Sequence, residues 1–300
     1  MRIVSLFPAA TEIVCALGLR DQLVGISHGC DYPPEIDGVA IVTRPRKGAG
    51  AASARTAAAG QDMGPAELDK AALLSSQPEL VIAREGTLGP GSAAVREALG
   101  ESADGTSIIT LDPVSIEGIF HSITSVGAMA EVEDEAIGLL EALREDIGDI
   151  EQQVVVRHDL GLRPKRVVVL ESLAPLMASG RWVPEQVRRA GGWELLGREG
   201  EPASATSWEA VLEVDPEMMI LAPGGLSLRD AKRAWARTEK PEFWDEISAV
   251  RRGQVFVVEP VYFCRPGPRV AYGVSMLAEI FDPEGFVETS PPASWTTLFE

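Results

Sequence analysis

The sequence predicts an α/β protein of two similar Rossmann-like lobes that are joined by a single long helix. Three observations support this fold class. Apolar runs of strand length alternate with helical patterns, the second half of the chain repeats features of the first, and a proline-free stretch rich in alanine, leucine and glutamate separates the two halves. Alternating strands and helices are typical of parallel α/β layers. A length of 300 residues suits about two domains.

The strand candidates are short apolar runs of four or five residues, at 2–6, 80–83, 107–111, 166–170, 218–221 and 255–258. This length is typical of buried strands, and helical patterns lie between the runs.

The two halves of the chain resemble each other. RIVSL leads to a helix that ends in Ala16-Leu17-Gly18, and RVVVL leads through a longer loop to one that ends in Ala190-Gly191-Gly192. Pro78-Glu79 opens the strand LVIA, and Pro216-Glu217 opens MMILA. We therefore expect two similar lobes.

Residues 115–156 form a strongly helical stretch, with the richest helix-forming composition at 130–151. A helix of about 20 residues is about 30 Å long, enough to connect two lobes as a stiff spine. The expected organisation is an N-terminal lobe at 1–114, a helical region at 115–160 and a C-terminal lobe at 161–282. Residues 48–64 are predicted to be a mobile loop, and 283–300 a tail on the surface.

Charge and composition exclude several classes of partner and of structural site. A formal net charge of -18 repels nucleic acid and anionic membranes, so neither is expected as a partner. Three cysteines without CxxC spacing indicate neither a disulfide framework nor a zinc site. No apolar run is long enough to span a membrane. The N-terminal segment is interpreted as part of the folded mature protein and not as a signal peptide. Location stays open: cytoplasmic as numbered, or extracytoplasmic if a leader or lipoprotein signal was removed.

The candidate site lies in the loops that follow the strands, because ligands bind at the carboxyl ends of strands in open α/β sheets. Aromatic rings there can form flat walls for a planar ligand, and arginines can reach acidic or amide groups at its rim. The alternative is that each aromatic ring only packs its own loop. The candidate ligand-binding residues are Phe7, Pro8, Ala9, His28, Cys30, Asp31, Tyr32, Arg84, Glu85, Glu171, Arg181, Trp182, Tyr262, Phe263 and Arg265.

Several of these residues have alternative interpretations. His28 and Cys30 could ligate a metal in the ligand, hydrogen-bond its rim, or serve loop structure. Glu171 could face the cleft or cap the next element. His121 and His158 are expected to be ordinary helix residues. Residues 25–29 match the G-x-S-x-G pattern of a serine hydrolase with Ser27 as nucleophile, but Pro33-Pro34 blocks the helix that this motif needs.

Five segments resemble a known family: RIVSLFPAATEIVCALGL, SHGCDYPPE, ESLAPLMASGRWVPEQVRRAGG, SWEAVLEVDPEMMI and YFCRPGPRVAYG. They are similar to the cobalamin-binding and iron-siderophore-binding members of the ABC-transporter substrate-binding proteins. The resemblance covers nearly the whole chain, and SHGCDYPP and GRWVPE favour the cobalamin binders. It implies the helical-backbone (class III) form of the fold, little hinge motion, and a ligand held between the lobes.

The resemblance also implies function and partners. The chain is expected to be a monomer without catalytic activity. Its expected ligand is cobalamin, or alternatively a ferric siderophore or haem. It would either deliver this ligand to an ABC permease or be an intracellular relative of the proteins that do. Family members dock on the permease through one acidic residue on each lobe. Glu209 matches the second, but Ala71 stands at the first, where Asp69 or Glu67 could substitute.

Overall fold

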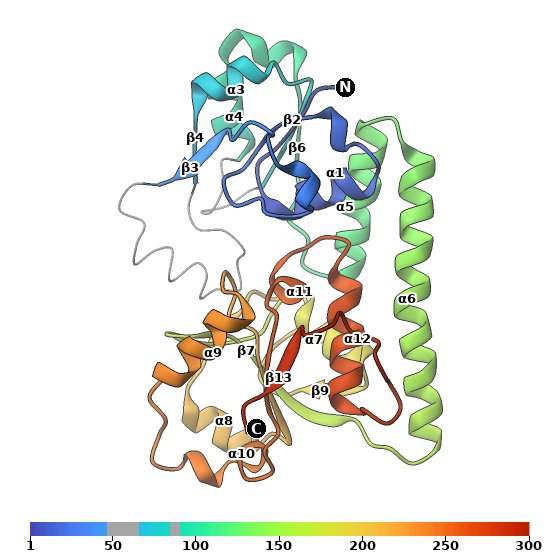
Figure 1. The fold of residues 1–300 in the computed structure, drawn as a ribbon, viewed down its shortest axis with the longest axis vertical. Coiled ribbons are helices and arrows are strands. Elements are labelled where there is room, and N and C mark those ends of the chain that lie inside the picture. Colours follow the sequence, from blue (N-terminus) through green and yellow to red (C-terminus); the bar gives the residue numbers. More distant parts are fainter. Residues whose placement is uncertain (47–65, 85–90, 300) are drawn as a thin grey trace.

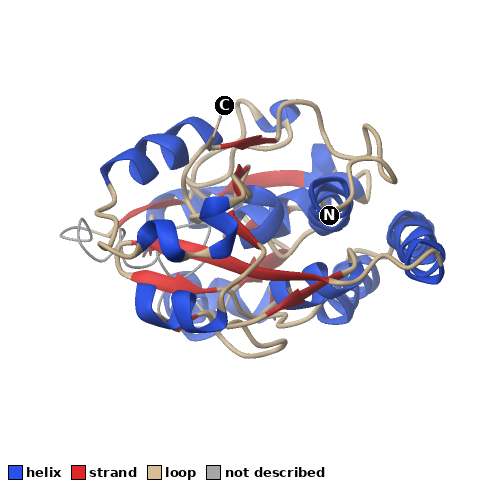
Figure 2. Ribbon diagram, turned by 90° about the horizontal axis from the view of Figure 1, so that it is seen from below, coloured by secondary structure: helices blue, strands red, loops and turns tan. Residues whose placement is uncertain are grey.

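The computed structural model describes residues 1–46, 66–84 and 91–299. It shows an upper lobe, a lower lobe and one long helix, α6 (Glu133–Asp159), that runs beside both (Figure 1). Viewed from below, the strands lie between layers of helices, and α6 stands end-on at one side (Figure 2). Within the described residues, no helix combines the length and the apolarity that crossing a bilayer requires.

The upper lobe is built on a parallel four-stranded sheet in the order β2-β1-β5-β6. β5 is buried along its whole length, and the strands predicted at 2–6, 80–83 and 107–111 are confirmed. A small antiparallel pair, β3-β4, stands beside the sheet. The elements of this lobe are β1 (Ile3–Ser5), α1 (Pro8–Ala16), β2 (Leu23–Ile26), β3 (Thr43–Pro45), β4 (Ala66–Leu68), α3 (Lys70–Ser76), β5 (Leu80–Ala83), α4 (Ser92–Leu99) and β6 (Ser107–Thr110).

The lower lobe has a seven-stranded mixed sheet in the order β10-β8-β7-β11-β12-β13, with β9 also paired to β7. The predicted strands at 166–170, 218–221 and 255–258 are its parallel centre. Its elements are β7 (Lys165–Leu173), β8 (Leu176–Ala178), α7 (Val183–Arg189), β9 (Gly192–Glu194), β10 (Ser204–Ala205), α8 (Trp208–Val214), β11 (Met218–Leu221), α9 (Leu228–Arg237), α10 (Ser248–Arg251), β12 (Val255–Val258), α11 (Val261–Cys264), α12 (Val270–Phe281) and β13 (Trp295–Thr297).

The repeat seen in the sequence has a structural counterpart. At the start of β1, the backbone N–H of Arg2 donates to Glu79, and the Arg2 guanidinium donates to the Ser76 carbonyl. At the start of β7, the N–H of Arg166 donates to Glu217, and its guanidinium donates to the Val214 carbonyl. The same pair of bonds therefore ties the first strand of each lobe to the loop before its central strand.

The helical stretch predicted at 115–156 consists of two helices, α5 (Ile116–Met129) and α6. The chain reverses at Glu131, which has a positive φ of 58°. Three acidic residues in the first turn of α6 favour a helix start there. The turn is tight, because a side chain on Gly127 would meet the Ala136 Cβ atom at 2.6 Å.

α6 is the spine that the sequence predicts. Its buried residues recur every three or four positions and so lie on one face: Ala136, Leu140, Leu143, Ile147, Ile150 and Val154. This face belongs to a single hydrophobic cluster that contains residues of both lobes. Near its end, Arg157 donates to both carboxylate oxygens of Asp282, at 2.5 and 2.9 Å.

The C-terminal segment differs from the expected surface tail. β13 adds an antiparallel strand to β12, and the Trp295 ring lies 5.8 Å from that of Phe256. Phe286 is buried as well. The prolines between 283 and 292 hid this strand in the sequence. The loop predicted at 48–64 lies outside the described residues.

The buried face of the spine predicts a contrast within one helix. Ile147→Ala should lower the free energy of unfolding by about 2–5 kcal/mol, because it removes a side chain that is 2% exposed from a packed core. Ile137→Ala is the matched control, since Ile137 is 55% exposed, and should change stability by less than about 1 kcal/mol. Urea denaturation of both variants measures the difference. Equal losses would contradict this packing of α6.

Candidate functional site

The two lobes meet through a cluster of four charged residues, of which Glu12 and Arg265 are buried. Arg265, which follows α11 in the lower lobe, donates to Glu12 of α1 at 3.0 Å and to both oxygens of Asp31 at 2.6 and 3.0 Å. Arg269 donates to both oxygens of Glu12, at 2.8 and 2.5 Å. We call these four residues the interlobe ion-pair cluster. It brings loops that follow β2 and β12 together across the lobe boundary.

The charges in this cluster are not equally buried. The side chains of Glu12 and Arg265 are 3% and 5% exposed, whereas that of Asp31 is 63% exposed. Partial burial alone would raise the pKa of Asp31, but its hydrogen bonds with Arg265 and the positive charges of both arginines lower it. Asp31 is therefore ionised at neutral pH. Arg265, predicted to reach groups at the ligand rim, is instead occupied by two carboxylates.

Aromatic rings line the same boundary. The Arg269 guanidinium lies 4.2 Å from the centre of the Tyr32 ring and 5.6 Å from that of Tyr262. Tyr262 in turn meets Tyr272 edge to face, at 5.8 Å. Tyr32 is 43% exposed and Tyr262 is half-buried, so both predicted wall residues offer surface near the lobe boundary. The structure thus brings Asp31, Tyr32, Tyr262 and Arg265 together as one group.

His28 and Cys30 are half-buried in the loop after β2. His28 Nδ1 lies 2.7 Å from Thr43 Oγ1, and Cys30 Sγ lies 3.0 Å from Thr11 Oγ1. Burial lowers the pKa of His28 below its usual 6.5, so the imidazole is neutral at neutral pH. With Nδ1 occupied by Thr43, a ligand would be met through Nε2.

Ser27 is completely buried, and its hydroxyl accepts hydrogen bonds from the Gly29 N–H and from Thr43. A loop rather than a helix follows it. The strand-to-helix turn that exposes a hydrolase nucleophile is therefore not formed here. His121 and His158 lie in α5 and α6, as expected.

The predicted residues at the start of α1 are buried. Pro8 opens this helix, Phe7 is 4% exposed and Ala9 is 1% exposed. The guanidinium of Arg84, after β5, lies 6.0 Å from the centre of the Phe7 ring and 3.8 Å from Asp112. Glu85 lies outside the described residues.

Two predicted ligand walls belong to the core instead. Trp182 and Phe263 are both 1% exposed, so in this structure neither ring presents a face to a cleft. Both rings belong to the large hydrophobic cluster that contains residues of both lobes.

Glu171 is buried beside the loop that carries Arg181. It accepts a hydrogen bond from the Gly180 N–H at 2.9 Å. Burial raises its pKa to about 7, although this hydrogen bond and the charge of Arg181 act in the opposite direction. Arg181 is half-buried and has a positive φ of 53°. The carboxyl group therefore holds this loop in place.

Sequence reasoning missed the residues that organise the lobe boundary. Glu12 and Arg269 lie within two of the family-like segments, but neither was predicted to have a role of its own. A charged residue inside the otherwise apolar helix PAATEIVCA was the available signal, because a buried charge needs a partner.

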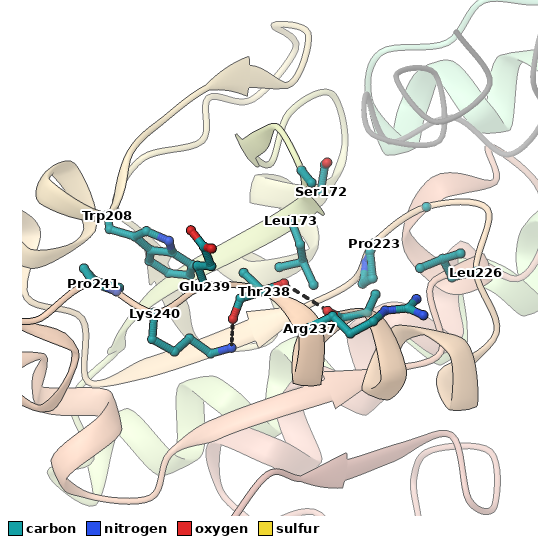
Figure 3. Close-up of a pocket in the computed structure, with 13 residues that line it drawn as sticks. Ser172, Leu173, Trp208, Pro223, Leu226, Arg237, Thr238, Glu239, Lys240 and Pro241 are labelled. Carbon is teal, nitrogen blue, oxygen red and sulfur yellow. Dashed lines mark hydrogen bonds between the residues drawn. The ribbon is translucent and has the colours of Figure 1, made fainter. Parts of the chain in front are cut away.

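A cavity of about 750 Å³ in the lower lobe contains none of the predicted ligand-binding residues (Figure 3). Trp208 forms one wall and packs edge-on against Trp235 and Trp244. Lys240 lies over the Trp235 ring and donates to the carbonyls of Trp235 and Thr238. The residues that line the cavity are Ser172, Leu173, Ala174, Trp208, Pro223, Gly224, Leu226, Ala234, Arg237, Thr238, Glu239, Lys240 and Pro241.

The two predicted docking residues lie at equivalent helix starts. Glu209 is exposed in the first turn of α8, and hydrogen bonds from its own backbone N–H and from Ser207 lower its pKa. In the upper lobe, Asp69 caps α3 by accepting from the Ala72 N–H at 3.1 Å. The residue that corresponds to Glu209 is Ala71, as the sequence indicated.

Comparison with known proteins gives consistent results. The family model described as "Periplasmic binding protein" matches residues 3–262. An uncharacterized ABC transporter substrate-binding lipoprotein of Bacillus subtilis is 27% identical, over 96% of this chain and 82% of that protein. A vitamin B12-binding protein of Vibrio cholerae is also 27% identical, over 92% and 87%. The crystal structure of a periplasmic heme-binding protein from Pseudomonas aeruginosa shares the fold, with a TM-score of 0.71, 22% identity and coverage of 94% and 93%.

The buried carboxyl of Glu171 predicts a pH dependence of stability. Its pKa of about 7 lies above the ordinary 4.5, so the folded state binds this proton more tightly than the unfolded state. Relative to Glu171→Gln, the natural protein should therefore lose stability as the pH rises from about 5 to about 8, by at most about 3 kcal/mol. Urea denaturation at several pH values measures this.

Glu209→Gln is the control for this experiment, because Glu209 is exposed and ionised throughout that range. Its stability difference from the natural protein should stay constant with pH. A constant difference for Glu171→Gln as well would show that Glu171 has an ordinary pKa.

Proposed function

The chain belongs to the periplasmic binding protein family, and we propose that it binds a corrinoid between its two lobes. It is a substrate-binding protein of the kind that serves ABC uptake systems, and it is not an enzyme. The corrinoid assignment rests on one observation in particular, which is the charge balance at the lobe boundary.

Among the described residues, both arginines of the interlobe ion-pair cluster are paired with carboxylates. The interlobe ion-pair cluster contains two guanidinium groups and two carboxylates, and Arg84 lies near Asp112. Haem carries two propionates, which would need unpaired positive charge at their binding site. Cyanocobalamin is neutral overall, and its corrin ring carries amide side chains, which hydrogen bonds and aromatic surfaces can satisfy. The balance of charges therefore favours the corrinoid over haem.

The residues best placed to meet such a ligand are exposed or half-buried near the boundary. Tyr32 and Tyr262 would supply aromatic surface, while His28 and Cys30 would supply polar groups. The vitamin B12-binding relative from Vibrio cholerae supports the same ligand class. Delivery to a permease would use the exposed carboxylate of Glu209, with Asp69 at the edge of the upper lobe.

Ligand titrations test the proposal directly. We expect saturable one-to-one binding of cyanocobalamin, and markedly weaker binding of haem and of a ferric hydroxamate siderophore. Visible absorption and calorimetry on the purified protein measure all three. Preferential binding of haem or of the siderophore would reject the corrinoid assignment and leave the substrate-binding role in place.

From the position of His28 we predict a change in the visible spectrum of a bound corrinoid, with a defined pH dependence. If Nε2 replaces the water ligand of aquocobalamin, binding should shift the visible spectrum, and His28→Ala should abolish the shift. Since burial lowers the pKa of His28, the shift should persist as the pH falls to 6.5 and disappear only at lower pH, when the imidazole becomes protonated.

His121→Ala is the control, because His121 is an exposed residue of α5. It should keep the full spectral shift. Tight binding of aquocobalamin by the natural protein with an unchanged spectrum would exclude metal ligation by His28.

A further inference from the structure

The internal repeat places two buried glutamates at matching positions. Glu12 in α1 and Glu185 in α7 each lie six residues before a glycine of positive φ, Gly18 and Gly191. Both carboxylates reach toward the opposite lobe. Glu185 accepts from the Ile116 N–H at the start of α5 and from Arg189 of its own helix, whereas Glu12 pairs with Arg265 and Arg269.

Only the upper-lobe glutamate controls groups at the candidate ligand site. Both oxygens of Glu12 are occupied by guanidinium N–H groups. Held in this way, Arg265 forms a two-bond pair with Asp31, and Arg269 covers the Tyr32 ring. Glu12 thus fixes two lower-lobe arginines, and these fix the upper-lobe loop that carries Asp31 and Tyr32.

We propose that Glu12 is a positioning residue that also sets the charge preference of the ligand site. With Glu12 ionised, the interlobe ion-pair cluster is neutral, and Asp31 and Tyr32 are held in place. Without its carboxylate, the same cluster carries a net positive charge at the lobe boundary, and its arginines lose their shared anchor. The charge preference in this inference rests on the proposed corrinoid-binding function. The positioning role of Glu12 does not depend on it.

Two ligands of nearly equal size test the charge preference. One is cyanocobalamin, and the other is its monocarboxylic acid, in which hydrolysis of one peripheral amide adds a single negative charge. Glu12→Gln should shift the ratio of the two affinities toward the acid by roughly tenfold, because a negative charge on the ligand is attracted by the uncompensated guanidinium. Calorimetric titration of both ligands measures the ratio. An unchanged ratio would overturn the proposal.

Two further variants separate this effect from a general loss of structure. Glu185→Gln makes the same substitution at the matching position of the lower lobe. Glu185 is not a member of the interlobe ion-pair cluster, so this variant should leave the ratio of the two affinities unchanged. Asp31→Asn removes a carboxylate that is largely exposed, so the fold is retained, and it should shift the ratio in the same direction as Glu12→Gln. If Glu12→Gln does not fold, an unshifted ratio in Asp31→Asn overturns the proposal.

A measurement without ligand distinguishes failure of this inference from failure of the corrinoid assignment. Hydrogen–deuterium exchange of residues 28–32 should become faster in Glu12→Gln and stay the same in Glu185→Gln. If neither corrinoid binds but exchange changes as expected, the ligand assignment fails and the positioning role stands. Unchanged exchange in a folded Glu12→Gln protein would reject the positioning role.

Discussion

The arrangement of the two lobes depends on buried charges that must be satisfied across the boundary between them. Glu12 is buried within an apolar helix, where an unpaired carboxylate would be very costly. Its partners come from a segment more than 250 residues later in the chain. Removing one member of such a buried pair leaves the other uncompensated, so the pair fixes the lobe arrangement strongly even where its net contribution to stability is small.

Apolar packing reinforces this constraint along the spine. One hydrophobic cluster runs from the upper sheet through α5 and α6 to α7, α12 and the lower sheet. The Arg157–Asp282 pair closes the lower end of α6. The lobes are therefore joined by a shared core along one side and by ion pairs at their facing loops. We therefore expect little reordering of the lobes when a ligand binds.

The sequence predicted most of the fold and less of the site. The six apolar runs and the repeated Pro-Glu pairs were sufficient for the central strands of both sheets, because their signals are local, whereas the short strands β8, β9 and β10 were not predicted. The reversal at Glu131 and the strand β13 were missed, since one depends on a close helix–helix contact at Gly127 and the other on pairing with β12. Among the site residues, the sequence did not predict which side chains are exposed. Trp182 and Phe263 have the right chemistry for a ligand wall but are buried. Loop composition does not reveal which way a ring turns.

The strand β13 has a consequence for synthesis of the protein. It follows every other described strand in the sequence, and it pairs with β12 at the edge of the lower sheet. During translation the upper sheet is complete once β6 has emerged from the ribosome, so that lobe can fold early. Its buried Glu12, however, must wait for Arg265 and Arg269, and the lower sheet must wait for residues 295–297. A nascent chain therefore holds a half-built boundary until residues 265–297 have emerged, and a ribosome that stalls before them leaves Glu12 of the upper lobe without its arginine partners.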